Sequence, residues 1–268
     1  MNEKPTATKE APLAILVVDD DELNQRMMRL ILKREGHLVE TALNGVEAVE
    51  AVKSKRFDII LMDLQMPEMD GVEASRRIRE LENGKGRIFI VALTASFLPE
   101  KGRELFEAGI DNYMAKPFEV AHLRNILQHG LERRTSGAVS KMDDPVSALP
   151  VKGQPSDLDF RVGIERVGGN SVVYKELLSD FVDELPGKLE QLWSNYRYRD
   201  LNGLYRAAHN LKGVSANLGA LQLSAHAQKL ERQVSQGYTE SIEALLNDIS
   251  PIIIKLEETA RNYFTAGK

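Results

Sequence analysis

The sequence contains no cysteine among its 268 residues. Without cysteine the chain can form neither a disulfide framework nor a metal–thiolate site, and it has no thiol nucleophile. No apolar run approaches the roughly 18 residues of a membrane span. The polar opening, MNEKPTATKEAP, has no apolar segment of the kind that a secretory signal needs. We therefore expect a soluble, cytoplasmic protein without a membrane span.

The sequence also lacks a large excess of either charge. Residues 1–132 hold 18 Lys and Arg against 23 Asp and Glu, a balance of 18 − 23 = −5, and residues 133–268 hold 17 of each, a balance of zero. A protein that binds a phosphate backbone usually carries a basic surface excess. Neither half has one, so no nucleic-acid partner is expected.

Residues 11–132 alternate short β-rich runs with segments of helical period. The β-rich runs are LAILVVD, LVETA, FDIILMDL, RIFIVALTA and DNYMA. A run such as Asp58 to Met62 is apolar nearly throughout, which indicates a strand buried on both faces. The pattern predicts an α/β, doubly wound, five-stranded parallel sheet with five helices. Ligands of such sheets bind at the carboxyl ends of the strands.

Residues 133–157 are rich in Pro, Gly, Ser and Asp and predict a flexible linker. Residues 158–266 then carry four apolar stripes with helical spacing, which predict an all-α antiparallel four-helix bundle. Pro186 and Pro251 interrupt the first and last stripes, but the apolar spacing continues past both. We expect kinks there rather than helix ends.

Four aspartates follow two of the predicted strands. The run ILVV leads into Asp19, Asp20 and Asp21, and the run DIILM leads into Asp63. In a parallel sheet Asp19, Asp20 and Asp63 would share one pocket, and carboxylate oxygens suit Mg²⁺. Asp21 is expected to cap the following helix.

Two later strand ends supply groups that a phosphoryl group in this pocket would need. VALTAS offers the hydroxyl of Thr94, and YMAKPF offers the ammonium of Lys116. The order Asp-Asp, Asp, Thr, Lys on successive strand ends, together with MDLQMPEMDG, resembles the receiver domain of two-component response regulators. The segments DDDELNQRMMRLIL and ALNGVEAV look most like receivers attached to hybrid sensor kinases.

This resemblance implies a role for each matching residue. Asp63 corresponds to the aspartate that accepts a phosphoryl group from a phosphohistidine. Asp19 and Asp20 would bind Mg²⁺ together with Asp63 and the backbone carbonyl of Gln65.

The resemblance also implies the surroundings of the phosphoryl group. Thr94 would hydrogen-bond to it, and Lys116 would pair with its charge. Tyr113 matches the aromatic position that switches together with Thr94, and the peptide bond from Lys116 to Pro117 is expected to be cis. Gln65 and Ser96 are expected to flank the pocket.

The second half contains one histidine in an unusual context, YRAAHNLKGVSANLGA. His209 lies about 200° around the helix from the apolar Leu211, so we expect it to face water. Lys212, Gly213 and Ala216 share its face at i+3, i+4 and i+7. The small residues would let a partner protein approach the imidazole, and the ammonium could accompany a phosphoryl oxygen.

The segment His209 to Ser215 resembles the histidine-phosphotransfer (Hpt) domain, whose core pattern is H-x-L-K-G-x-S/A. The resemblance implies that His209 carries a phosphoryl group, with Lys212 beside it and Gly213 and Ala216 at the docking surface. No kinase ATP-binding motif is present. The expected function is a phosphorelay in which a sensor histidine kinase, Asp63, His209 and a downstream receiver exchange phosphate. In this scheme the receiver catalyses its own phosphorylation, and the protein is not a conventional enzyme with a diffusing substrate.

Two alternatives remain. In one, the receiver controls access to His209 by docking and does not donate phosphate to it. A linker of roughly 25 residues spans about 25 to 30 Å, so such intramolecular docking is feasible. In the other, DDDEL is the D-x-D opening of a haloacid-dehalogenase-type phosphatase with Asp19 as nucleophile. Leu23 and the segment PFEVAH depart from that family's pattern.

Overall fold

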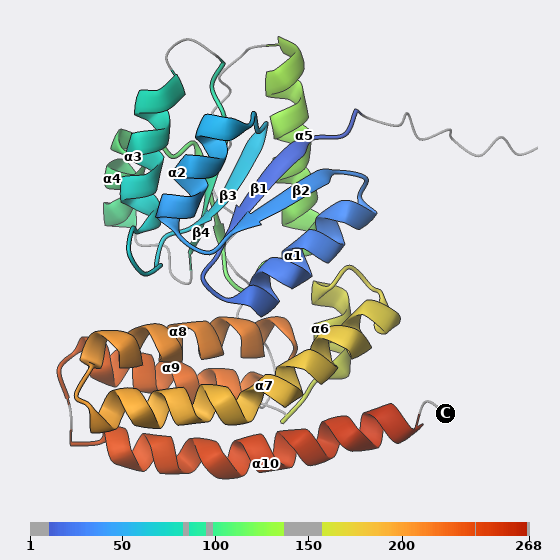
Figure 1. The fold of residues 1–268 in the computed structure, drawn as a ribbon. Coiled ribbons are helices and arrows are strands. Elements are labelled where there is room, and N and C mark those ends of the chain that lie inside the picture. The colour runs from blue at the N-terminus through green and yellow to red at the C-terminus, as the bar shows by residue number, and fades with distance from the viewer. Residues whose placement is uncertain (1–10, 83–85, 95–98, 137–156, 239, 267–268) are drawn as a thin grey trace, which may run out of the picture.

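The computed structural model describes residues 11–82, 86–94, 99–136, 157–238 and 240–266. Two bodies stand one above the other in Figure 1, an α/β body formed by the first half of the chain and a helical body formed by the second half. Most of the segment expected to be a linker, residues 133–157, lies outside the described residues. Helix α5 takes in its first residues, because it ends at Ser136.

The first body alternates strand and helix as the sequence predicted. Its strands are β1 (Ala14–Val18), β2 (Leu38–Ala42), β3 (Ile59–Asp63), β4 (Phe89–Thr94) and β5 (Asn112–Ala115). Its helices are α1 (Glu22–Arg34), α2 (Gly45–Ser54), α3 (Gly71–Glu82), α4 (Pro99–Glu107) and α5 (Val120–Ser136). All strand pairs are parallel, in the order β2-β1-β3-β4-β5. The predicted doubly wound sheet is confirmed.

Alternate residues of each strand point to opposite faces of the sheet, and each face is covered by its own helices. Ile15 and Ile59 belong to the apolar cluster that includes α1 and α5, whereas Leu16 and Ile60 belong to the cluster that includes α2 and α3. Figure 1 shows α1 and α5 on one side of the sheet and α2, α3 and α4 on the other. Burial on both faces explains why the strands read as continuous apolar runs.

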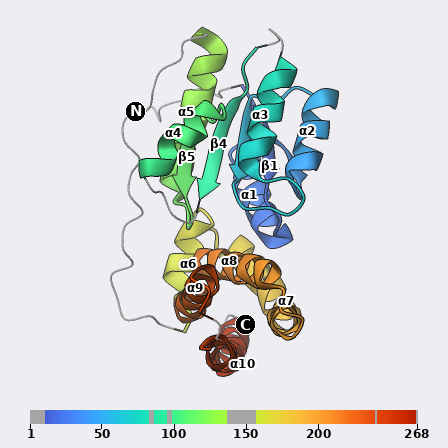
Figure 2. The same ribbon diagram turned by 90° about the vertical axis from the view of Figure 1, so that its left-hand side faces the viewer.

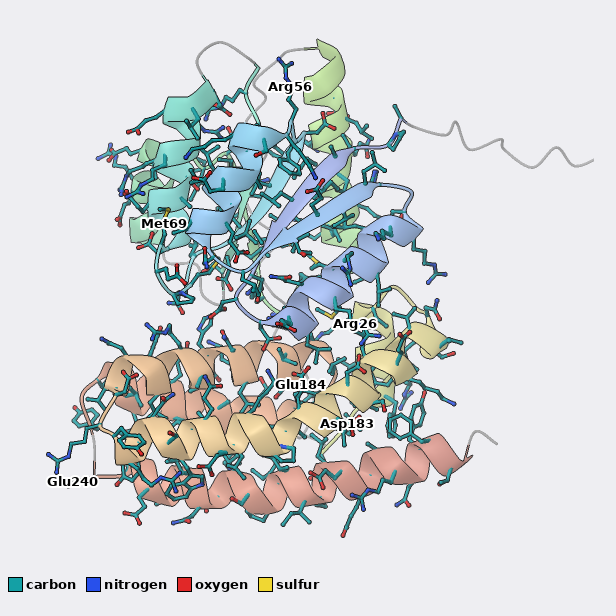
Figure 3. All side chains as sticks on the ribbon, in the orientation of Figure 1. Arg26, Arg56, Met69, Asp183, Glu184 and Glu240 are labelled. Atoms are coloured by element: carbon teal, nitrogen blue, oxygen red, sulfur yellow. The ribbon has the colours of Figure 1, made fainter. Side chains whose placement is uncertain are left out.

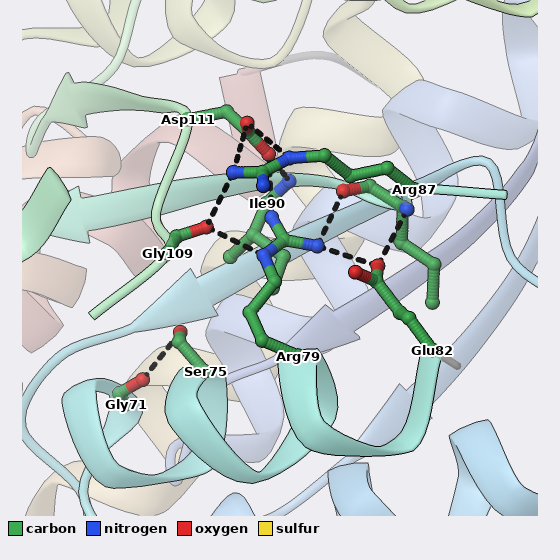
Figure 4. A network of polar contacts seen from close by, with 9 residues as sticks. Gly71, Ser75, Arg79, Glu82, Arg87, Ile90, Gly109 and Asp111 are labelled. Atoms are coloured by element: carbon green, nitrogen blue, oxygen red, sulfur yellow. Dashed lines mark hydrogen bonds and ion pairs between the residues drawn. The ribbon is translucent and has the colours of Figure 1, made fainter. Parts of the chain in front are cut away.

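The amino ends of β4 and β5 are held by a network around Arg79 of α3 (Figure 4). Its guanidinium donates to the carbonyl of Gly109 at 2.7 Å and to the carboxylate of Asp111 at 2.6 Å. Arg87 donates to the other oxygen of Asp111 at 3.0 Å. The network lies at the opposite end of the strands from Asp63, so it stabilises the sheet without contributing to the predicted site.

The second body contains the four predicted long helices and one short helix that the sequence analysis missed. They are α6 (Phe160–Arg166), α7 (Ser171–Arg197), α8 (Leu201–Asn217), α9 (Leu221–Ser235) and α10 (Ile242–Ala266). Pro186 lies inside α7 and Pro251 inside α10, so neither proline ends its helix. The short α6 has only seven residues, which is too few to give a clear apolar stripe, although its Phe160 and Ile164 pack against the core.

Helix α8 is the bundle helix nearest to the sheet, and α10 lies on the far side of the bundle in both ribbon views (Figures 1 and 2). One apolar cluster runs through both bodies, from Ile31 of α1 and Leu123 of α5 to Leu178 of α7 and Leu211 of α8. Among the described residues, no helix combines the length and the apolar character that crossing a bilayer requires.

Candidate functional site

The carboxyl ends of β1 and β3 bring three carboxylates together. Oxygen atoms of Asp19, Asp20 and Asp63 all lie within 4.8 Å of one another. Asp19 and Asp63 are almost fully buried, and Asp20 is half-buried. Asp21 does not join them but caps α1, because its side chain accepts hydrogen bonds from the backbone of Leu23 and Asn24. The predicted grouping and the predicted cap are both present.

Lys116 follows β5 and reaches into this cluster. Its ammonium donates to Asp19 Oδ2 at 2.7 Å and also pairs with Asp63 Oδ2, and the Lys116–Pro117 peptide bond is cis. Burial lowers the pKa of Lys116, but the two carboxylates raise it further, so the net pKa is above the ordinary lysine value. Burial raises the pKa of Asp19 to about 7, against the opposing effect of Lys116. Crowded, desolvated acids of this kind are typical of a functional site.

The donor set fits a divalent cation. The site gathers three carboxylates around a single ammonium, so the carboxylates outnumber the cationic groups that can neutralise them. Asp20 Oδ1 is buried and has no hydrogen-bond partner in the part of the chain that the structure describes. A buried oxygen without a partner is costly unless a ligand binds it. An all-oxygen set is also the chemistry that Mg²⁺ prefers.

The turn after β3 depends on Gly71, the first residue of α3. Its backbone N–H donates to the carbonyl of Leu64 at 3.2 Å. A Cβ atom at position 71 would lie 2.1 Å from the backbone oxygen of Asp63, a separation that no side chain tolerates. Gly71 therefore permits the close approach of α3 that holds Asp63 in place.

The other predicted pocket residues occupy neighbouring positions. Thr94 ends β4, and its carbonyl accepts a hydrogen bond from the backbone of Lys116 at 2.6 Å. Tyr113 is buried in β5 among the apolar residues of the α2 and α3 side. Gln65 donates its backbone N–H to Asp63 Oδ1 at 3.0 Å. Ser96 lies outside the described residues.

His209 was expected to face water, and this prediction is wrong. The residue is 5 % exposed, because the helix face that carries it lies against the first body and against α9. Its Nδ1 lies 2.6 Å from Glu231 Oε1, and the other oxygen of Glu231 accepts a hydrogen bond from Lys212 at 2.5 Å. Periodicity located the polar face of α8 correctly, but it could not show that this face is covered.

Glu231 is the site residue that the sequence analysis missed. It belongs to α9 and lies between the core positions Leu230 and Val234. In the sequence, an acid at such a position is typical of an ordinary surface residue. Burial raises its pKa, but the hydrogen bonds from His209 and Lys212 outweigh this effect and leave the pKa below the ordinary value. Glu231 is therefore ionised at neutral pH and fixes the orientation of the imidazole.

Gly213 and Ala216, the small residues expected to admit a partner, are both buried. A Cβ atom at Gly213 would meet no atom within 4 Å, so the first body leaves room there. The backbone oxygen of Ala216 accepts a hydrogen bond from Arg166 of α6.

The two predicted sites open onto one cavity of about 730 Å³ between the bodies. Asp63 and Thr94 line it from the sheet, and His209, Lys212 and Glu231 line it from the bundle. A hydrogen bond of 3.1 Å from Gln65 Nε2 to the hydroxyl of Tyr205 crosses the interface beside the cavity. The tertiary structure thus places the two expected phosphoacceptors in a common space.

Charged and polar contacts between α1 and the bundle hold this arrangement. Lys188 Nζ pairs with Asp21 Oδ2 at 2.7 Å, and both side chains are largely buried. Arg26, labelled in Figure 3, forms ion pairs with Asp180 and Glu176 of α7. Asp21 therefore has a second role that its position as a helix cap did not reveal.

Comparison with known proteins agrees with both resemblances. Residues 15–128 match the model of the response regulator receiver domain, and residues 176–258 match that of the Hpt domain. The chain is 31% identical over 261 residues to the sensor protein GacS of Pseudomonas syringae pv. syringae, an alignment that covers 96% of this chain and 28% of GacS. It is 28% identical over 257 residues to the signal transduction histidine-protein kinase BarA of Escherichia coli K12, with 95% and 27% covered.

A solved structure, the receiver domain of the sensor histidine kinase PA1611 from Pseudomonas aeruginosa PAO1 with a magnesium ion in its active-site cleft, is 39% identical. The match covers 46% of this chain and 99% of that domain, with a TM-score of 0.42. The chain belongs to the two-component phosphorelay proteins and consists of a receiver domain followed by an Hpt domain. It spans little more than a quarter of the length of the curated relatives GacS and BarA.

Proposed function

We propose that the chain is a phosphorelay module in which Asp63 accepts a phosphoryl group from the phosphohistidine of a sensor kinase and His209 exchanges it with a receiver aspartate. The observation that carries this proposal is the cavity lined by both Asp63 and His209. A common cavity removes the need for the two acceptors to find each other by diffusion. A downstream receiver on another chain is the second partner.

Transfer to Asp63 requires positioning and charge neutralisation. A carboxylate oxygen of Asp63 attacks phosphorus in line as the P–N bond of the donor breaks, and the departing imidazole keeps the electron pair of that bond. The Lys116 ammonium lies beside the same carboxylate and offsets the charge of the transferred group. The hydroxyl of Thr94 donates a hydrogen bond to the transferred phosphoryl group, and the side chain of Tyr113 switches together with Thr94.

Asp19, Asp20 and Asp63, with the backbone carbonyl of Gln65, would hold Mg²⁺. We call these three aspartates the acid cluster. When bound, the ion offsets the negative charge of the acid cluster and of the phosphoryl oxygens. The grouping of the three carboxylates and the unpartnered oxygen of Asp20 support this assignment.

At His209 the geometry favours Nε2 as the phosphoryl carrier. The Nδ1–H donates to the ionised Glu231, so the lone pair of the neutral ring lies on Nε2. As Nε2 attacks phosphorus, the acyl O–P bond breaks, the carboxylate of Asp63 is regenerated, and the ring becomes positively charged. Glu231 stabilises that charge, and Lys212 holds Glu231 in place.

Phosphosite mapping tests the proposal. The full chain is incubated with Mg²⁺ and acetyl phosphate, and phosphorylated residues are identified by mass spectrometry under conditions that preserve acyl phosphate. We expect phosphate on Asp63 and then on His209. Asp63→Asn should abolish both signals, and His209→Gln should abolish the second.

Two matched variants serve as controls. Asp70→Asn changes another carboxylate that lines the same cavity, and His226→Gln changes another bundle histidine. Both should keep the wild-type pattern. Phosphate on Asp19 but not on Asp63 would instead support the phosphatase-type alternative.

A second candidate is a docking switch, in which the receiver covers His209 without donating phosphate to it. The burial of His209 against the receiver favours it. The rate at which phosphate leaves Asp63 and reaches His209 distinguishes the candidates. A rate independent of protein concentration supports intramolecular relay, whereas a rate proportional to concentration contradicts it. No transfer at any concentration supports the switch.

A further inference from the structure

Helix α8 presents two asparagines to the receiver, Asn210 and Asn217, seven residues apart and so on one side of the helix. The amide of Asn210 donates to Asp20 Oδ2 at 3.1 Å. The amide of Asn217 donates to Asn24 Oδ1 of α1 at 3.3 Å. Neither asparagine has a role in the phosphotransfer chemistry proposed above.

Both contacts lead to the acid cluster. Asn210 reaches Asp20 directly, and Asn217 reaches Asp19 through Asn24, whose amide donates to Asp19 Oδ1 at 3.2 Å. Asn24 and Asn217 are almost fully buried, so water competes little for these bonds. One bundle helix thus orients two of the three carboxylates.

The three carboxylates differ in the domain that supplies their hydrogen-bond and ion-pair partners. Lys116 pairs with Asp19 Oδ2 and Asp63 Oδ2, and these bonds lie within the receiver. Asp20 is held through Oδ2 by the bundle, and its Oδ1 is buried without a partner among the described residues. A neutral amide orients a carboxylate without cancelling its charge, so Asp20 keeps its full attraction for a cation.

We propose that docking of α8 and binding of a divalent cation at the acid cluster are coupled, with Asn210 and Asn217 as positioning residues that hold Asp20 and Asp19 in a metal-binding orientation. The inference rests on the magnesium site of the proposed function and extends it to regulation of the domain arrangement. Coupling of two binding equilibria is reciprocal. Docking therefore raises the affinity for the cation, and the cation strengthens docking by the same factor.

Calorimetric titration of the full chain with Mg²⁺ tests the first half of the coupling. We expect Asn210→Ala to raise the dissociation constant roughly tenfold, the lower end of the effect of removing a partner that orients a metal ligand. Asn217→Ala should raise it less, because its contact acts through Asn24. The matched control is Asn262→Ala, which makes the same change at an exposed position of α10.

The reciprocal effect is that of Mg²⁺ on docking. It is measured as the fraction of chains in which the bundle is docked on the receiver. Because the chain has no cysteine, Ser54→Cys and Glu258→Cys place two fluorophores at exposed positions, one in each domain, without background labelling. Addition of Mg²⁺ should increase energy transfer between them. Asn210→Ala should shift the midpoint of that titration by the same factor as the calorimetric dissociation constant.

The outcomes separate this inference from the proposed function. Equal Mg²⁺ affinities for Asn210→Ala and Asn262→Ala, or energy transfer that does not respond to Mg²⁺, would overturn the coupling while phosphorylation of Asp63 remains intact. Absence of Mg²⁺ binding by every variant, the wild type included, would overturn the magnesium site itself and the coupling with it.

Discussion

At the residue scale, the contact between His209 and Glu231 carries the most chemical information. A histidine with one nitrogen bound to a carboxylate has a fixed tautomer and a fixed ring orientation. Lys212, expected to accompany the phosphoryl group, pairs with Glu231 in this structure. We propose that the lysine also acts on the histidine through the glutamate.

We expect Glu231→Gln to slow phosphoryl transfer from Asp63 to His209 roughly tenfold, which corresponds to about 1.4 kcal/mol, near the lower end for a hydrogen bond to a charged group. The amide keeps the size of the side chain but loses the charge that stabilises the phosphorylated ring. Phosphohistidine formation can be followed by ³¹P NMR. Glu258→Gln, at an exposed position of α10, is the control, and equal rates for the two variants would contradict the assigned role.

The lowered pKa of Glu231 also predicts a pH dependence of stability. Its pKa in the folded chain lies below the ordinary value of 4.5, so ionised Glu231 stabilises the fold above pH 4.5, and this contribution is lost as the pH falls through the folded pKa. The difference in unfolding free energy between the wild type and Glu231→Gln should therefore be larger at pH 7 than at pH 3.5. Urea unfolding at the two pH values measures it, and a difference that does not change with pH would refute the prediction.

At the element scale, the sheet positions Asp63, the proposed acceptor, and the turn that follows confines it. Strand β3 ends at Asp63, and α3 begins at Gly71 directly against the backbone of Asp63. Two glycines of this chain therefore differ in the space around them. Gly71 is required by close packing, whereas the exposed Gly187 inside α7 has open space where a Cβ would lie.

Alanine substitution should separate these two glycines. Gly71→Ala forces α3 away from Asp63, and we expect a loss of about 1–3 kcal/mol of stability together with reduced phosphorylation of Asp63. Gly187→Ala should stabilise the bundle by about 0.5–1 kcal/mol, because glycine is a poor helix former. Urea unfolding followed by the fluorescence of Trp193, which lies in α7, reports on the bundle. Stabilisation by Gly71→Ala would show that the turn is not close-packed.

At the scale of the whole molecule, the two domains are joined by an apolar cluster and by ion pairs that differ in exposure. The pairs of Arg26 are about one-third or more exposed, whereas Asp21 and Lys188 are largely buried. Exposed pairs contribute little each and are screened by salt, and buried pairs are screened much less. Docking should therefore be sensitive to ionic strength without being abolished by it.

We expect energy transfer between fluorophores at Ser54→Cys and Glu258→Cys to fall partially as the salt concentration rises from about 0.05 to 0.5 M, where screening lengths become shorter than 10 Å. Arg26→Gln should reduce the salt response, because it removes the exposed pairs. Arg77→Gln, which removes a pair within α3, is the control. Full energy transfer at every salt concentration would contradict an electrostatic share in docking.

Much of the fold and site could be predicted because those features depend on local pattern. Side-chain period separates strand from helix, and strands of one parallel sheet end at one edge, so the sequence order of Asp19, Asp63, Thr94 and Lys116 already implied a common pocket. The helical spacing around His209 similarly located the polar face of α8.

The sequence by itself determined the two domains, the acid pocket and the phosphoacceptor candidates. The tertiary structure alone decided that His209 is buried, that Glu231 rather than solvent meets its Nδ1, and that Asn210 reaches Asp20. The physical reason is that periodicity records which side of an element is polar, since that depends on neighbours a few residues away. Which element covers that side depends on how two separately folded surfaces fit together, and no local spacing records it.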